Sequence, residues 1–177
     1  VWLIRTDPAG NLLWSNTLGG SGRDYGFAIA ALPDGFVLAG KTTSLDLPGG
    51  KNSAGLNDGW LIRTDASGNL LWHKTFGGSK EDNFIGMLAL PDGFLLVGQA
   101  QSQDLPGAPK TAADYDAWLL RTDGAGTLLW NRTLGGSGVD QATKLVALAH
   151  GFAVVGYSGS TDWPGGAKSA GGIDLWV

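Results

Sequence analysis

The chain has 177 residues and a net charge of −4, and its 12 Lys and Arg residues are scattered along it. This leaves no basic stripe to neutralise phosphates, so nucleic acid is not expected as a partner. The absence of cysteine excludes disulfides and thiolate chemistry, and no apolar stretch approaches the roughly 18 to 20 residues that span a bilayer.

Tryptophan returns at a constant interval along the chain, at Trp2, Trp60, Trp118 and Trp176. The interval is 58 residues each time (60 − 2, 118 − 60, 176 − 118). Nearly half of the aligned positions are identical in all three copies, which indicates tandem duplication. The 30 glycines and eight tryptophans are typical of short strands separated by tight turns. We therefore expect an all-β repeat protein.

The repeats divide the chain into four parts. Residues 1–22 are expected to supply the third and fourth strands of one unit, and residues 23–80 and 81–138 to form a complete unit each. Residues 139–177 then supply a first and second strand and the start of a third. No helix is expected in any of these parts.

The complete middle copy contains four segments with the composition of strands: Phe84–Leu90, Phe94–Gly98, Trp118–Thr122 and Leu128–Thr133. Hairpin-length turns join them, except that a long polar connection joins the second to the third. The strands are apolar on both faces, which is expected when each sheet is sandwiched between neighbours. Single glycines in the second strand, Gly40, Gly98 and Gly156, predict close approach to a neighbouring strand.

Four short antiparallel strands in every 58-residue repeat are typical of β-propeller blades. The fold class that we predict is therefore all-β, with three repeats of four-stranded antiparallel blades. Three blades are too few to close a ring, because each sheet fills only a limited wedge around the axis. We expect the chain to be part of a larger or oligomeric propeller, completed by further repeats or by self-association.

Two motifs recur that resemble a known family. They are Asp-x-Trp-Leu-Ile-Arg-Thr-Asp-x-x-Gly-Asn-Leu-Leu-Trp and Thr-x-Gly-Gly-Ser-x-x-Asp, accompanied by an Asp-Gly-Phe hairpin and a Ser-x-Asp-Leu-Pro-Gly insertion. They resemble the bacterial and archaeal β-propeller repeats found in secreted proteins. The third copy departs from the pattern with Trp163 for Leu, and with His150 for the Asp of the hairpin turn. The resemblance implies a propeller fold and an extracellular or cell-surface location, but no activity.

Six aspartates that recur once per copy are the candidate ligand-binding residues. One set follows the Gly-Gly-Ser turn and the other lies in the long connection: Asp24, Asp82 and Asp140, then Asp46, Asp104 and Asp162. Both sets are expected at the same end of the blades, where an acidic ring could bind Ca²⁺ or a cationic partner. The alternative is structural, because Asp beside Gly or Ser commonly accepts backbone N–H bonds that hold a turn. No Asp-x-Asp-x-Asp-Gly run favours calcium, and no other cofactor is expected.

Two further recurring sets have structural interpretations. Arg5, Arg63 and Arg121 lie inside a strand, so we expect them to be buried and bonded to carboxylates. Tryptophans also recur in the fourth strand, at Trp14, Trp72 and Trp130. They could form a sugar-stacking surface, but packing between blades or at a blade rim is the favoured interpretation.

Catalysis is not expected. His73 and His150 occupy different positions in their copies, and neither Gly-x-Ser-x-Gly nor His-Glu-x-x-His is present. The predicted function is a non-catalytic module for binding or scaffolding, with a protein or glycan ligand held by the connections 44–58, 102–116 and 160–174. One alternative is a structural subunit that assembles through blade edges into rings or fibres. Another is a glycan-active enzyme domain, which would need an asymmetric cleft.

Overall fold

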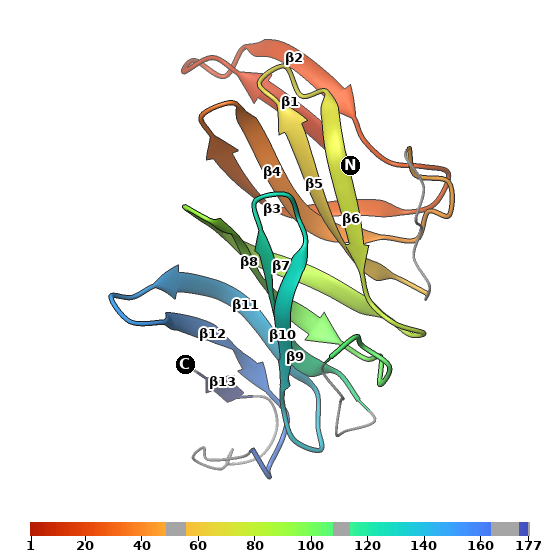
Figure 1. The fold of residues 1–177 in the computed structure, drawn as a ribbon, viewed down its shortest axis with the longest axis vertical. Helices are drawn as coiled ribbons and strands as arrows, with labels where there is room; N and C mark the ends of the chain where they lie inside the picture. Colours follow the sequence, from red (N-terminus) through yellow and green to blue (C-terminus); the bar gives the residue numbers. More distant parts are fainter. Residues whose placement is uncertain (49–55, 108–113, 164–173, 177) are drawn as a thin grey trace.

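The computed structural model describes residues 1–48, 56–107, 114–163 and 174–176, and its regular structure there consists of β-strands without a helix (Figure 1). This confirms the all-β prediction. The strands are β1 Trp2–Thr6, β2 Leu12–Thr17, β3 Asp24–Leu32, β4 Gly35–Thr42, β5 Asp58–Asp65, β6 Leu70–Phe76, β7 Asp82–Leu90, β8 Gly93–Ala100, β9 Asp116–Asp123, β10 Leu128–Leu134, β11 Asp140–Ala147, β12 Phe152–Ser158 and β13 Asp174–Trp176.

The strands form four antiparallel sheets in which consecutive strands are neighbours. Two sheets have four strands each, β3 to β6 and β7 to β10, while β1 pairs with β2 and β11 to β13 form a three-stranded sheet. The four segments predicted in the middle copy are all strands, and they are slightly longer than predicted. The short turns explain this meander, because each hairpin returns the chain to the adjacent position.

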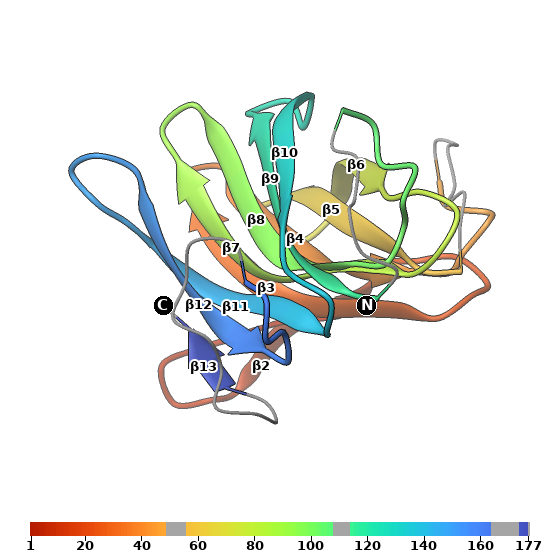
Figure 2. The same cartoon turned by 90° about the horizontal axis from the view of Figure 1, so that it is seen from below.

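The sheets follow one another along the molecule, with β1 and β2 at one end and β13 at the other (Figure 1). The first strands of successive sheets contact each other, β3 with β7 and β7 with β11. The view turned by 90° shows the strands of successive sheets fanning out from this region (Figure 2). Each sheet therefore presents its two faces to different neighbours.

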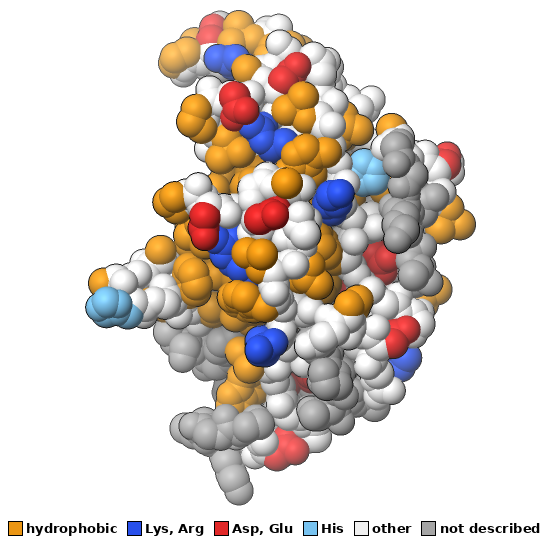
Figure 3. Space-filling model, viewed as in Figure 1, with side chains coloured by type: hydrophobic (Ala, Val, Ile, Leu, Met, Phe, Trp, Pro, Cys, Tyr) orange, Lys and Arg blue, Asp and Glu red, His pale blue; other side chains and the backbone are white. Residues whose placement is uncertain are grey.

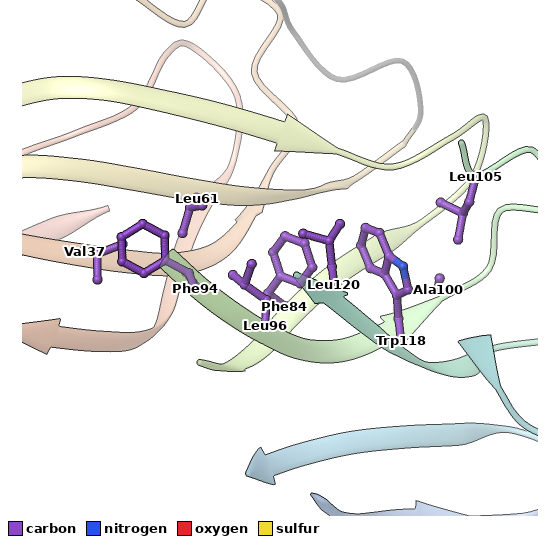
Figure 4. Packing of buried hydrophobic residues seen from close by; sticks show 10 residues of the cluster. Val37, Leu61, Phe84, Phe94, Leu96, Ala100, Leu105, Trp118 and Leu120 are labelled. Carbon is purple, nitrogen blue, oxygen red and sulfur yellow. The ribbon is translucent and has the colours of Figure 1, made fainter. Parts of the chain in front are cut away.

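The largest hydrophobic cluster lies between the two four-stranded sheets (Figure 4). Val37 and Leu61 from one sheet meet Phe84, Trp118 and Leu120 from the next, and all five are at most 1% exposed. The ring of Phe84 stacks on that of Trp118 with centroids 4.7 Å apart. This interface buries large apolar side chains from both sheets, which stabilises one sheet against the other.

The other faces of these sheets are packed as well. Trp60 and Ile62 lie in a cluster with Leu3 of the β1–β2 sheet, and each is at most 5% exposed. Val97 packs with Ala142 of β11 on the far side. The prediction that the strands are apolar on both faces because they are sandwiched is confirmed for these two sheets.

The recurring glycine of the second strand is explained by a close approach within its own sheet. A Cβ atom on Gly40, Gly98 or Gly156 would lie only 1.8, 2.0 or 1.8 Å from a carbonyl oxygen of the paired first strand. The strand register shifts next to each of these contacts, which is the mark of a β-bulge. A side chain at this position would displace the bulge.

The described residues form no helix of the length and apolar character needed to cross a bilayer.

Candidate functional site

The recurring aspartates of the long connections, Asp46, Asp104 and Asp162, link two loops at one end of the sheets. In the middle copy the backbone N–H and the hydroxyl of Ser79 donate to Asp104 Oδ1 over 2.9 and 3.1 Å. Ser21 makes the same two bonds to Asp46, and Ser137 makes them to Asp162. The Gly-Gly-Ser turn between sheets and the start of the long connection are therefore held together in every copy. We call this contact the Ser–Asp clamp.

The clamp aspartates remain exposed at the surface, so a ligand could reach them. The hydrogen bond from the backbone of Ser21 is the largest cause that holds the pKa of Asp46 below its ordinary value. The equivalent bonds from Ser79 and Ser137 lower the pKa of Asp104 and Asp162. These carboxylates are therefore ionised near neutral pH and have one oxygen committed to the turn.

The recurring aspartates that follow the Gly-Gly-Ser turn, Asp24, Asp82 and Asp140, have a different environment. Asp82 and Asp140 are fully buried, and Asp24 is partly buried. Asp82 accepts bonds from the backbone of Gly78, Gln101 and Ser102 over 2.9 to 3.1 Å, and from the Ser102 hydroxyl over 2.5 Å. These contacts fit the turn-holding alternative. Of the six candidate ligand-binding aspartates, Asp46, Asp104 and Asp162 are the ones that lie exposed.

No group of three or more His, Cys, Asp or Glu side chains suited to a metal ion occurs within the described ranges. The clamp aspartates recur in separate sheets, and each accepts hydrogen bonds from its own serine. Calcium binding therefore has no preformed cluster of oxygen ligands to support it in this part of the chain.

A polar residue of the fourth strand supports the long connection, and sequence reasoning missed it. Asn131 Nδ2 donates to the carbonyl of Pro106 over 2.7 Å, while its Oδ1 accepts from Trp118 Nε1. In the preceding copy the ring nitrogen Nε2 of His73 lies 2.8 Å from the Pro48 carbonyl and must donate to it. The residue type differs between copies, so identity between repeats could not reveal the shared role.

The recurring arginines confirm the sequence prediction in two copies out of three. Arg63 and Arg121 are each 6% exposed, and each bonds the aspartate of the hairpin turn in its own sheet, Asp34 or Asp92. Arg5 is exposed instead, so the prediction is wrong for that residue. The reason is that β1 pairs only with β2, so none of the described hairpins brings an aspartate to Arg5 as Asp34 and Asp92 are brought to Arg63 and Arg121.

We expect replacement of Arg121 by alanine to lower the free energy of unfolding by about 2–3 kcal/mol, measured by urea denaturation. Besides Asp92, its guanidinium donates to the carbonyls of Phe94 and Thr122, which would lose a buried donor. Arg5→Ala is the matched control, and its effect should stay within about 0.5 kcal/mol because Arg5 is exposed. Equal losses in the two variants would contradict this assignment.

Two of the three fourth-strand tryptophans, Trp14 and Trp72, lie against the following sheet. Trp14 packs edge-on against Phe36 with centroids 6.1 Å apart, and Trp72 lies against Phe94 at 6.3 Å. Both rings also cover a turn glycine of the next sheet, Gly68 or Gly126, where a Cβ would meet them within 2.9 Å. This position supports packing between sheets over a free sugar-stacking surface.

The long connections are described only in part. Their middle segments, 49–55, 108–113 and 164–173, lie outside the described residues, and these segments belong to the predicted ligand surface. At the end of the second connection, the Tyr115 hydroxyl donates to Glu81 over 2.7 Å, and burial is the largest cause that raises its pKa. This contact ties the end of the connection to the residue that precedes the first strand of the same sheet.

Comparison with known proteins gives one partial likeness. The chain is 31% identical over 137 residues to a protein from Caulobacter vibrioides described as regulatory protein FlaEY. The match covers 71% of this chain and 14% of the relative, so the chain spans a small part of that protein. No family model matches the chain.

The clamp predicts a specific dependence of stability on pH. Because the pKa of each clamp aspartate is lower in the folded chain, its stabilisation is complete above the ordinary value of 3.8 and disappears as the pH falls through the lowered value. Between pH 4 and pH 2 the melting temperature of the triple variant D46N/D104N/D162N should therefore fall less than that of the parent chain. Melting curves of both proteins across that interval test this, and parallel curves would contradict it.

Proposed function

We propose that the chain is part of a β-propeller and acts as a non-catalytic platform for a protein or glycan ligand, outside the cell or at its surface. Consecutive antiparallel strands in each sheet and face-to-face packing of successive sheets support a propeller arrangement. Contacts between the first strands of neighbouring sheets are also in keeping with strands gathered around an axis. The ligand is assigned to the end of the sheets that carries the long connections.

The observation that carries this proposal is a fixed backbone with variable side chains. In each copy the serine two residues before the clamp aspartate, such as Ser44, and the clamp aspartate itself, such as Asp46, are both anchored by hydrogen bonds. The residue between these two anchors is exposed and differs in every copy: Leu45, Gln103 and Thr161. A constant frame that presents three different side chains at equivalent positions suits recognition of a ligand.

Two further observations support the choice of a binding role in this proposal. The acidic residues recur identically in every copy, whereas an active site normally departs from such symmetry. The partial relative is described as a regulatory protein. A location outside the cell follows from the resemblance to secreted repeats and is part of the proposal.

The proposal is tested by screening the chain against arrays of soluble glycans and peptides, followed by titration of each hit. The triple variant L45A/Q103A/T161A should weaken binding at least about tenfold, the usual cost of losing one or more good contacts. The control triple L13A/L71A/L129A removes side chains that are 55–56% exposed on the fourth strands and should leave binding unchanged. Unchanged binding in the first variant, or turnover of a glycan, would overturn the proposal.

A further inference from the structure

A hollow lies between the fourth strand of the β1–β2 sheet and the sheet that follows it. Its volume is about 550 Å³, and it is bordered by residues 15–18 on one side and by the turn between β5 and β6 on the other. This turn lies beside β2 in the ribbon view (Figure 1). We call the hollow the β2 pocket. Its lining includes four side chains with a hydroxyl or an amide and two leucines: Ser15, Asn16, Thr17, Asn69, Leu18 and Leu70.

The two asparagines of the β2 pocket are held in fixed orientations. Asn16 Nδ2 donates to the carbonyl of Ser67 over 2.9 Å, and Asn69 Nδ2 donates to Asp65 Oδ2 over 2.9 Å. A carbonyl and a carboxylate can only accept, so the nitrogen of each amide must face its partner and the oxygen is left for other donors. Within the described residues no donor bonds either Oδ1 atom. The pocket therefore has two acceptor oxygens that are already positioned for a ligand.

The remaining lining side chains give the β2 pocket a mixed polarity. Ser15 and Thr17 supply hydroxyls, and these side chains make no hydrogen bond to another described residue. Leu18 and Leu70 are half-buried and supply apolar area. Because a hydroxyl can donate as well as accept, the pocket offers both kinds of hydrogen-bond partner beside an apolar wall.

Charge does not contribute to the β2 pocket. In the part of the chain that the structure describes, no charged side chain lines it. On the face seen in Figure 3, acidic and basic side chains lie next to one another over the sheets, as in the ion pair of Arg63 with Asp34. Such pairs largely cancel, so this face provides no field of one sign. A charged ligand would lose hydration in the pocket without gaining an opposite charge.

The equivalent position between the next two sheets carries larger and charged side chains. Ser15, Asn16, Leu18 and Asn69 are replaced there by His73, Lys74, Phe76 and Thr127. The stem of Lys74 lies against the turn, because a Cβ on Gly126 would come within 3.0 Å of its Cγ. In the first junction the shorter Asn16 takes this place, with Nδ2 at 2.8 Å from a Cβ on Gly68. The β2 pocket therefore departs from the symmetry of the repeats, as a site with its own ligand does.

We propose that the β2 pocket binds a neutral saccharide. The hydroxyls of a sugar both donate and accept, and its ring presents C–H groups, so it matches the lining hydroxyls, the fixed amide oxygens and the leucines together. The volume of about 550 Å³ lies within the range of small-ligand pockets. A peptide in extended form is less well matched, because it is recognised along a groove or a strand edge and not in a compact hollow.

The site goes beyond the ligand that we assign to the long connections, since the two sites share no residue. Nuclear magnetic resonance titration of the isotope-labelled chain with maltose, cellobiose, lactose and chitobiose tests the proposal. At least one of these probes should shift the backbone amides of residues 15–18 and 67–70, with a Kd of about 1 mM or below.

Asn16→Lys gives the β2 pocket the residue that the next copy has at the same position, Lys74, so the fold accommodates it. The substitution removes a fixed acceptor and places a charge and a longer side chain in the pocket. It should therefore weaken the affinity for the bound saccharide at least about tenfold.

Asn69→Thr is a milder change that copies Thr127 of the next sheet, and it should weaken the affinity about fivefold. The matched control is Asn11→Thr. Asn11 makes the same bonds to Asp7 that Asn69 makes to Asp65, but it does not line the pocket. Its substitution should leave the affinity unchanged.

Melting curves check the fold of each variant, and if Asn16→Lys were unfolded, the comparison of Asn69→Thr with Asn11→Thr would decide the matter. Absence of binding by all of these saccharides would overturn the proposal. It would also be overturned by equal affinities of the pocket variants and the control, or by peptides that shift the pocket amides when no saccharide does.

The triple variant L45A/Q103A/T161A separates this site from the connections. It should leave the shifts of the pocket amides unchanged, and their loss in this variant would overturn the inference. A saccharide that shifts only the pocket amides is the ligand of this site, so it leaves the test of the connections unaffected.

Discussion

Replacing Trp118 by alanine should lower the free energy of unfolding by about 3–5 kcal/mol, the usual cost of removing a buried aromatic side chain. Trp118 is 1% exposed and stacks on Phe84 in the interface between the two complete sheets. Truncation would also leave Asn131 Oδ1 without the indole N–H that it accepts. Urea denaturation followed by far-ultraviolet circular dichroism measures this loss, because the chain would retain seven other tryptophans that complicate fluorescence.

Trp2 provides an internal control for this experiment, because it occupies the same repeat position and is 68% exposed. Trp2→Ala should change the free energy of unfolding by less than about 0.5 kcal/mol at concentrations where the chain is monomeric. A loss similar to that of Trp118→Ala would mean that burial does not determine the contribution of this residue. The comparison isolates the effect of a neighbouring sheet on an identical side chain.

The strands could be predicted from the sequence because each carries local signals. The repeat defines which segments are equivalent, and turn residues such as Asp123 and Gly126 separate the third strand from the fourth. Asp123 Oδ1 accepts backbone N–H bonds from Ala125 and Thr127, and Gly126 has the positive φ of 77° that the turn requires. These interactions lie within a few residues of one another, so the sequence specifies them directly.

The different environments of the end sheets could not be predicted from repeat identity. Arg5 has the same local sequence as Arg63, yet it is exposed because the carboxylate and the cover come from strands elsewhere in a complete sheet. The same reason applies to Trp2 and Trp60. Burial depends on which sheets are neighbours, and a local motif carries no information on that.

The candidate site was predictable in position but not in the role of each carboxylate. Recurrence placed Asp82 and Asp104 at the same end of the sheet, and hydrogen bonds to the connected loops agree with that placement. Their spacing could not show that Asp82 is buried while Asp104 is exposed. That difference depends on Ser102, whose side chain and backbone surround Asp82 after the connection folds over it.

Asp82→Ala should therefore lower the free energy of unfolding by about 3 kcal/mol or more, measured by urea denaturation at pH 7. The substitution removes the acceptor of three backbone N–H groups and of one hydroxyl, in a place where the carboxylate is 0% exposed. Buried donors that lose their partner cost about 1–3 kcal/mol each, reduced where water can enter the space.

The matched control is Asp24→Ala. Asp24 occupies the same repeat position and accepts from Gly20 and Ser44, but it is only partly buried. Water can replace the missing carboxylate there, so we expect a loss of about 1 kcal/mol. If Asp82→Ala were as stable as the parent chain, the aspartates that follow the Gly-Gly-Ser turn would not be responsible for holding that turn. A large loss for Asp82 and a small one for Asp24 would show that the turn network stabilises the protein in proportion to its burial.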